Sequence, residues 1–251
     1  MQPITVFQQN FETARSLIKL YDILVSNSEN DFPGNQKEDL LKLANIPDGT
    51  RCKIISNDYC LAVFRKTAHL SESFFDEDHL CQLLRQAIVA ACSAMDIYFN
   101  DKLQQNVMKV LLQYRQSAPK RLRELTMTFH DYFDLEQFHD PNEKLRQVIL
   151  GHFERRALAN IDAITEVAEI LGCRDFWHDV GRIIGSTPSA LKTRISDIVS
   201  RRNDIVHRAD REMDEESNDV QLKKVSRAWV NDHIEAVRTL VLAADEVIDH
   251  A

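Results

Sequence analysis

The spacing of hydrophobic residues along the chain predicts a protein built almost entirely of helices. Apolar positions recur every three or four residues over 5–27, 78–116, 160–172, 187–208 and 220–248, which is the period of one helix face. Only six glycines and six prolines interrupt the 251 residues. We therefore expect an all-α fold, arranged as an up-and-down helical bundle.

Residues at the ends of these segments indicate where two of the helices stop and start. Gly172 closes the segment 160–172, and glycine is common just after the last helical turn. Thr187 then suits an N-cap, and Pro188 suits the first helical position, where its missing N–H costs nothing. The helix that begins there should run to about Arg208.

The segment 45–70 is the least helical part of the chain. Pro47-Asp48-Gly49 is a turn signal, and the runs 52–55 and 59–64 favour two short strands of a hairpin. We therefore divide the chain in two. Residues 1–76 would form an N-terminal helix with an irregular or hairpin extension packed on the bundle, and residues 77–251 the main helical domain.

Bulk composition favours a soluble cytoplasmic protein. The chain is 44% hydrophobic and 28% charged, and no uncharged apolar run reaches the length of about 18 residues that suggests a membrane span. Its N-terminus lacks the basic start and apolar centre of a secretory signal. Five cysteines with no C-x-x-C pair argue against a disulfide framework or zinc knuckle, so Cys81 and Cys92 are expected in the core.

One cation in the segment 187–208 lies where an apolar residue is expected. Each helical position advances by about 100°, so Arg202 is at the centre of an apolar stripe, while Asn203 and His207 share one edge of it. A simpler interpretation remains open, because an arginine stem can cover apolar surface and a histidine can cap a helix end. The apolar residues within roughly 60° of Arg202 are Leu191, Ile195, Ile198, Val199, Ile205 and Val206.

Arg202, Asn203 and His207 match the R-x4-6-H motif of the HEPN superfamily, including the polar residue that often follows the arginine. The stretch 84–99 resembles the early helix of the RiboL-PSP type of HEPN domain, and residues 176–180 resemble the segment before its motif helix. The resemblance covers most of residues 77–250. It implies a HEPN-like helical bundle with the motif near its C-terminal end.

The resemblance also implies a metal-independent endoribonuclease that needs no cofactor. A histidine can move protons near neutral pH, an arginine can hold phosphate oxygens, and the amide of Asn203 can orient either group. HEPN domains place an acidic or polar residue of an early helix against the motif. We assign that role to Asp96, with a solvent-exposed carboxylate as the alternative.

Arg202 and His207 diverge by about 140° on a straight helix, so one copy cannot easily surround a phosphate. HEPN domains commonly dimerise with their motif helices facing each other, which implies a homodimer through the Arg202/His207 helix. The net charge of −8 is unfavourable for RNA, yet residues 192–211 contain six basic and three acidic residues. Within that segment Arg194, Arg201 and Arg208 are our candidate RNA contacts.

Families of this kind often act as toxins or effectors in phage defence or stress, so an antitoxin or other regulatory partner is a further expectation. The alternative function is a non-catalytic HEPN module that binds RNA or protein. A transcription regulator is disfavoured by the acidic net charge. A group of acids and histidines over 130–140 matches no metal-ligand spacing. We interpret it as packing, with Phe129, Tyr132, Phe133 and Phe138 as core residues.

Overall fold

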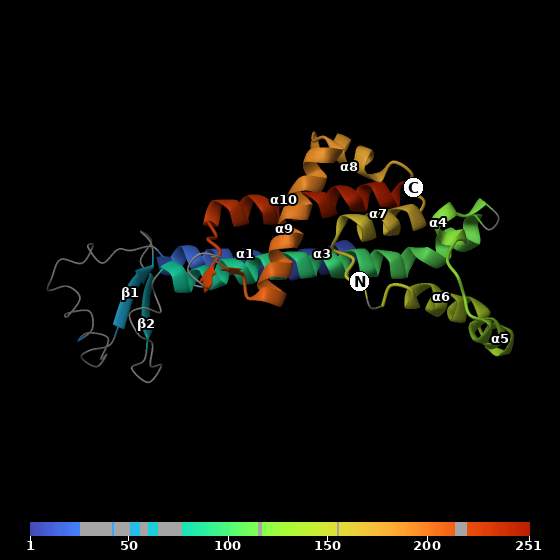
Figure 1. The fold of residues 1–251 in the computed structure, drawn as a ribbon, viewed down its shortest axis with the longest axis horizontal. Coiled ribbons are helices and arrows are strands. Elements are labelled where there is room, and N and C mark those ends of the chain that lie inside the picture. The colour runs from blue at the N-terminus through green and yellow to red at the C-terminus, as the bar shows by residue number, and fades with distance from the viewer. Residues whose placement is uncertain are drawn as a thin grey trace.

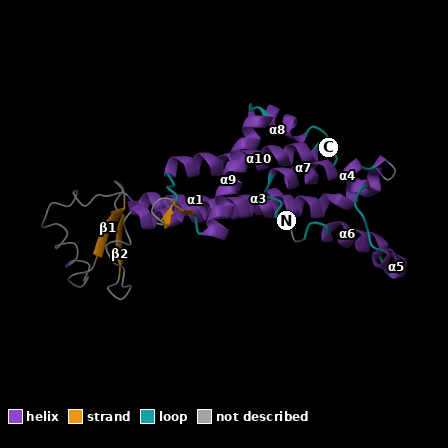
Figure 2. Cartoon of the chain, viewed as in Figure 1, coloured by secondary structure: helices purple, strands orange, loops and turns teal. Residues whose placement is uncertain are grey.

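The computed structural model describes residues 1–25, 42, 51–55, 60–64, 77–114, 117–154, 156–213 and 220–251. Helices dominate this part of the chain (Figure 2), so the expected all-α class is confirmed. The helices are α1 (Pro3–Val25), α3 (Glu77–Tyr114), α4 (Lys120–Arg123), α5 (Phe129–Gln137), α6 (Pro141–Gly151), α7 (Ile161–Ile170), α8 (Phe176–Ile184), α9 (Pro188–Arg208) and α10 (Arg227–Asp249). The strands are β1 (Arg51–Ile55), β2 (Cys60–Phe64), β3 (Arg211–Met213) and β4 (Val220–Leu222).

The long helix α3 is the axis of the fold, and α1 packs along it (Figure 1). Its predicted apolar face is buried throughout, from Leu80 through Leu84 and Met95 to Phe99. Phe7 and Phe11 of α1 join the same core, with the Phe7 ring edge-on to that of Tyr98. The N-terminal helix is therefore part of the main core.

Helices α7, α8 and α10 lie on one side of α3, while α9 crosses α3 steeply and its last turn extends past it (Figure 1). Ile195 and Ile198 of α9 and Val237 and Leu240 of α10 are fully buried in this layer. The crossing carries the C-terminal end of α9 from the centre of the bundle to its surface.

The predicted start and end of α9 are confirmed. The hydroxyl of Thr187 accepts a hydrogen bond from the backbone N–H of Ala190 at 3.2 Å, and Pro188 occupies the first turn. After Arg208 the chain enters the left-handed region at two successive residues, Ala209 (φ 52°) and Asp210 (φ 57°). This pair ends the helix and reverses the chain towards β3.

Two short antiparallel strand pairs flank the helices. β1 pairs with β2 in the register Ile55 opposite Cys60, as the predicted hairpin requires. β3 pairs with β4, and this corrects the predicted last helix, which begins at Arg227 and not near residue 220. The Ser226 hydroxyl caps α10 by accepting from the N–H of Trp229 at 3.2 Å, so the polar residues before it lie outside the helix.

Helices α5 and α6 form an arm that projects from the bundle near the C-terminal end of α3 (Figure 1). The prediction that Phe129, Tyr132, Phe133 and Phe138 pack as core residues was wrong, because all four are exposed. The predicted helical period was correct, but a helical period does not distinguish a helix face that is buried within the chain from one that is exposed. Over the described residues, no group of three His, Cys, Asp or Glu side chains is arranged to hold a metal.

By length and composition alone, helix α3 is long and apolar enough to cross a membrane. No other helix among the described residues meets these two criteria. More than half of that window, 56%, is buried inside the bundle, as in the core helix of a soluble fold. Cys81 and Cys92, which we predicted to be core residues, lie buried and unpaired on this helix, and Cys173 is buried and unpaired after α7. The predictions for residues 45–50, 56–59 and 65–70 lie outside the described residues.

Candidate active site at the C-terminal end of α9

The last two turns of α9 bring Arg202, Asn203 and His207 to the surface of the bundle. Arg202 is half-buried, whereas Asn203 and His207 are exposed. The Arg202 guanidinium donates from Nη1 to Oδ1 of Asn203 at 3.0 Å. The exposed His207 ring makes no hydrogen bond to any residue that the structure describes.

The apolar stripe around Arg202 is buried along most of its length. Leu191, Ile195 and Ile198 are buried, and Val199 and Ile205 are half-buried against the core. Val206 departs from the prediction, because 47% of it is exposed. Val206 lies in the last turn of α9, which extends past α3 (Figure 1).

Arg202 lies beside Cys92 of α3. Burial raises the pKa of the Cys92 thiol to about 12, while the positive charge of Arg202 acts in the opposite direction and Asp96 raises this pKa further. The thiol therefore stays protonated and takes no part in chemistry near neutral pH. The buried thiol acts instead as a small apolar core residue.

The expected contact between Asp96 and the motif is not present among the described residues. Asp96 Oδ1 instead accepts hydrogen bonds from the backbone N–H groups of Leu158 and Ala159, the second at 3.1 Å. These residues belong to the connection between α6 and α7, where the N–H groups have no helical partner. Through Oδ1 the carboxylate thus holds that connection against α3.

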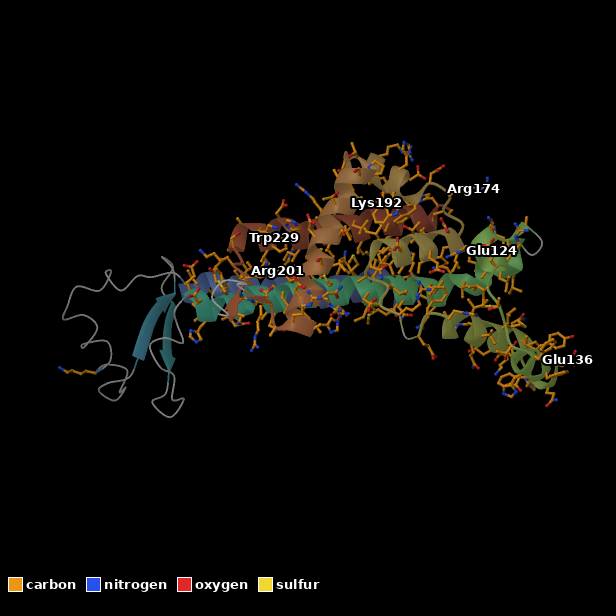
Figure 3. All side chains as sticks on the ribbon, in the orientation of Figure 1. Glu124, Glu136, Arg174, Lys192, Arg201 and Trp229 are labelled. Carbon is orange, nitrogen blue, oxygen red and sulfur yellow. The ribbon has the colours of Figure 1, made fainter. Side chains whose placement is uncertain are left out.

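Arg201 also departs from the prediction that it contacts RNA. Its side chain turns inward, towards the region where α9 meets the start of α10 (Figure 3). Nη2 donates to Asp210 Oδ2 at 2.9 Å and to the carbonyl oxygens of Lys223 at 3.0 Å and Lys224 at 2.9 Å, while Nε lies 2.9 Å from Asp210 Oδ1. A guanidinium with these partners stabilises the folded structure.

Asp210 is the acceptor at the centre of this arrangement, and sequence reasoning missed its role. It is completely buried, and its Oδ2 also accepts from Nε of Arg85 on α3 at 2.7 Å. Arg85, itself buried, donates to the Lys223 carbonyl at 2.7 Å. We call Arg85, Arg201 and Asp210 the arginine clamp. It fixes the end of the motif helix to α3 and to the strand pair β3–β4.

The only signal for the clamp in the sequence is an aspartate placed directly after a helix end, where Asp tolerates the left-handed conformation better than most residues. Backbone hydrogen bonds add to the clamp. The N–H of Asp210 donates to the Asp204 carbonyl at 2.9 Å, and the N–H of Lys223 donates to the Asp210 carbonyl at 2.8 Å. His207 therefore lies three residues before an anchored point.

The remaining charges leave a small exposed basic surface around the motif. Arg208 is well exposed and lies 3.9 Å from Asp204, and Arg194 makes a loose pair with Asp232 of α10 at 3.7 Å. Asp204 is held mainly by Nζ of Lys223 at 2.6 Å, and that hydrogen bond lowers the pKa of Asp204. The predicted positions of Arg194 and Arg208 at the surface thus stand, and their contact with RNA stays a prediction.

The geometry suits recognition of an anionic group at the end of α9. A half-buried guanidinium, an amide bonded to it and a solvent-facing imidazole are close in sequence and differ in direction, because five helical positions rotate a side chain by about 140°. One copy of the chain therefore presents Arg202 and His207 on different sides of α9. A ligand that uses both needs a second contribution from elsewhere.

Comparison with known proteins agrees with this architecture. The family model described as RiboL-PSP-HEPN matches residues 61–250. No curated protein and no solved structure matches the chain. The matched range begins within β2 and includes α3, α9 and α10, so the motif, the clamp and the core around them lie inside it. The chain belongs to the RiboL-PSP-HEPN family.

Proposed function

We propose that the protein is a metal-independent endoribonuclease of the HEPN type. The observation that carries this proposal is the end of α9, where Arg202, Asn203 and His207 lie together at the surface on a helix anchored by buried charges. The family match supports a ribonuclease or RNA-binding role in general. Cleavage is our specific proposal.

In the proposed reaction the 2′-hydroxyl of one ribose attacks the adjacent phosphorus. A P–O2′ bond forms while the bond to the 5′ oxygen breaks, which leaves a 2′,3′-cyclic phosphate and a 5′-hydroxyl end. His207 accepts the 2′ proton or delivers a proton to the departing 5′ oxygen. The Arg202 guanidinium stabilises the extra negative charge on the phosphorane, and Asn203 keeps that guanidinium in place.

We further propose that the cleft is shared between two copies of the chain. Arg202 and His207 of one copy point in divergent directions, and the exposed Val206 between them gives a two-fold interface its apolar contact. A protruding helix end with one apolar residue and free polar groups suits such an interface. Each phosphate would then meet the arginine of one copy and the histidine of the other.

Incubation of the purified full chain with total RNA in EDTA tests the proposal. Cleavage that leaves 2′,3′-cyclic phosphate ends is expected for the wild type and for His178→Ala, a matched exposed histidine on α8. Loss of at least a hundredfold is expected for His207→Ala, since general acid–base catalysis contributes about 10²–10⁴-fold. Equal rates for the two variants, or loss of cleavage in EDTA, would contradict the mechanism.

The shared cleft has its own test. Arg202→Ala and His207→Ala chains, each inactive alone, are mixed after mild denaturation and refolding. A shared cleft keeps one intact pair in the mixed dimer, so part of the activity should return. No recovery, together with a monomeric mass by sedimentation, would contradict a site built from two copies while leaving the ribonuclease proposal in place.

One observation favours the alternative function, a non-catalytic HEPN module that binds RNA or a protein. The Asp96 carboxylate is bound to the backbone of Leu158 and Ala159, so the motif lacks the acid that we expected beside it. Under this alternative, RNA binding measured by filter retention would persist in His207→Ala and no cleavage would occur in either chain.

We also propose a biological setting, in which the protein acts in the cytoplasm as a toxin or as an effector in antiviral defence and stress. Families that share this motif supply the reason for the proposal. Controlled expression should arrest growth of the host for the wild type and for His178→Ala but not for His207→Ala. An antitoxin or regulatory partner would then be sought by its ability to relieve that arrest.

A further inference from the structure

The arm formed by α5 and α6 presents an aromatic face that the described part of the chain leaves uncovered. Helix α5 has no buried residue. Phe129, Tyr132 and Phe133 occupy helical positions i, i+3 and i+4 and therefore share one side, with Phe129 84% and Phe133 56% exposed. Met127, just before α5, and Phe138, just after it, are also exposed. Contiguous apolar surface of this kind on a soluble protein marks an interaction site.

The charges around this aromatic face are mainly acidic. Apart from the histidines, residues 128–151 contain five acids against two basic residues, Lys144 and Arg146. Single-stranded RNA also stacks on aromatic side chains, but it needs cations along its backbone, and here its phosphates would meet carboxylates. Anionic lipid headgroups are repelled for the same reason. The acids are Asp131, Asp134, Glu136, Asp140 and Glu143.

One contact inside the arm shows how this surface binds a cation. Lys144 of α6 places its ammonium 3.0 Å from Oδ2 of Asp134 and 5.9 Å from the centre of the Phe138 ring. A carboxylate and an aromatic ring thus act together on one lysine. The exposed carboxylate of Glu136 can take the lysine or arginine side chain of a partner in the same manner, whereas Glu143 is already paired with Arg146 at 3.2 Å.

The arm is built to hold a fixed shape. Thr128 and Asp131 form a reciprocal capping box at the start of α5, and Asp140 caps α6. The ring of His152, just after α6, lies with Nε2 2.7 Å from the Thr126 carbonyl and so fastens the two ends of the arm together.

We propose that the α5–α6 arm is a docking surface for a basic amphipathic segment of another protein, whose apolar side packs on Phe129 and Phe133 and whose lysine or arginine residues pair with the acidic rim. The arm lies far from the motif helix, with Glu136 at its tip and Arg201 within the bundle (Figure 3). A partner held there leaves the end of α9 open. This proposal stands independently of ribonuclease activity.

Binding of labelled 20-residue helical peptides to the full chain, followed by fluorescence anisotropy, tests the proposal. One peptide carries Leu and Phe on one side and Lys on both flanks, and a second has Glu in place of every Lys. The Lys peptide should bind, and more weakly at high salt. Phe129→Ser/Phe133→Ser should weaken this binding at least tenfold, while Leu20→Ser/Ile183→Ser, at two equally exposed apolar positions on α1 and α8, should not.

Four results would overturn the proposal. Equal loss in both double variants, or none in either, would show that the aromatic face is not the contact. Equal affinity for the Lys and Glu peptides would remove the role of the acidic rim. Binding of a 20-nucleotide single-stranded RNA that disappears with Phe129→Ser/Phe133→Ser would make the arm a nucleic-acid site. Self-association lost in that variant would make the partner a second copy.

Melting curves show whether the double variant folds. Because the two phenylalanines are exposed, its melting temperature should stay within a few degrees of the wild-type value. The single variant Phe129→Ser, at the most exposed of these positions, replaces it if the melting temperature falls further. Unchanged peptide binding in Phe129→Ser would then count against the proposal in the same way.

Discussion

Replacement of Asp210 by asparagine should lower the free energy of unfolding by about 3–4 kcal/mol. The carboxylate is completely buried and faces two guanidinium groups, those of Arg85 and Arg201. Removal of one partner from a buried ion pair costs about 3–5 kcal/mol, because the other charge stays buried without compensation. Asparagine keeps the size of the side chain and tolerates the left-handed backbone, so the substitution isolates the charge.

We expect a loss in the lower part of the range of about 3–5 kcal/mol because of the surroundings of the two arginines. Arg85 is buried and keeps its full desolvation penalty, and its Nη1 has no hydrogen-bond partner among the described residues. The side chain of Arg201 is 18% exposed, so water can replace part of the lost contact. The melting temperature of a domain this size falls by about 2–4 °C per kcal/mol, which gives a decrease of about 6–16 °C.

Urea denaturation followed by circular dichroism measures the loss, with Asp22→Asn as the matched control. Asp22 also binds an arginine, Arg227, at 2.8 Å, but both side chains of that pair are exposed. An exposed pair contributes at most about 1 kcal/mol. If Asp210→Asn costs no more than Asp22→Asn, the clamp does not hold the end of α9. Addition of Arg85→Met to Asp210→Asn should recover stability, because it removes one uncompensated cation.

Two further predictions concern the same end of α9. The hydrogen bond from Lys223 lowers the pKa of Asp204 below its ordinary value of 3.8, so its contribution to stability is present above that value and is lost as the pH falls through the lowered pKa. The difference in stability between wild type and Asp204→Asn should be below about 1 kcal/mol, because the pair is partly exposed. This difference should be constant above about pH 5 and vanish in stronger acid. A difference that grows on acidification would contradict the assignment. Ala209→Gly should stabilise the fold by about 0.5–1 kcal/mol in the same denaturation assay. The left-handed backbone strains alanine by about 1–2 kcal/mol, and relief of this strain exceeds the cost of the chain entropy that glycine adds. An equal or lower stability would show that the φ of 52° carries no strain.

Sequence reasoning succeeded where the determining interactions are local. Thr187 and Pro188 fix the start of α9 through a side-chain cap and a ring geometry that depend only on neighbouring residues. The apolar period of α3 located the core face, since a helix this apolar can be satisfied only at the centre of a fold. The β1–β2 hairpin followed from a run of strand-forming residues in the same way.

The predictions that failed depend on distant partners. Arg85 and Asp210 are 125 positions apart, so no local pattern could join them, and nothing near Arg201 in the sequence indicated its buried partner. Asp96 was expected to contact the motif, and its Oδ1 instead accepts from the backbone of Leu158, which is 62 positions away. Whether the second copy and the RNA contacts follow the expected pattern stays a prediction.

The N-terminal helix has a consequence for how this domain must be delimited. The family match starts at residue 61, yet Phe7, Phe11 and Ile18 of α1 fill one side of α3 and are buried. A fragment cut at the family boundary would leave that side of α3 in water, with several large apolar side chains newly wetted. The helical domain is thus completed by α1, which lies upstream of the matched range. A transplant of this domain into another protein would therefore have to include α1.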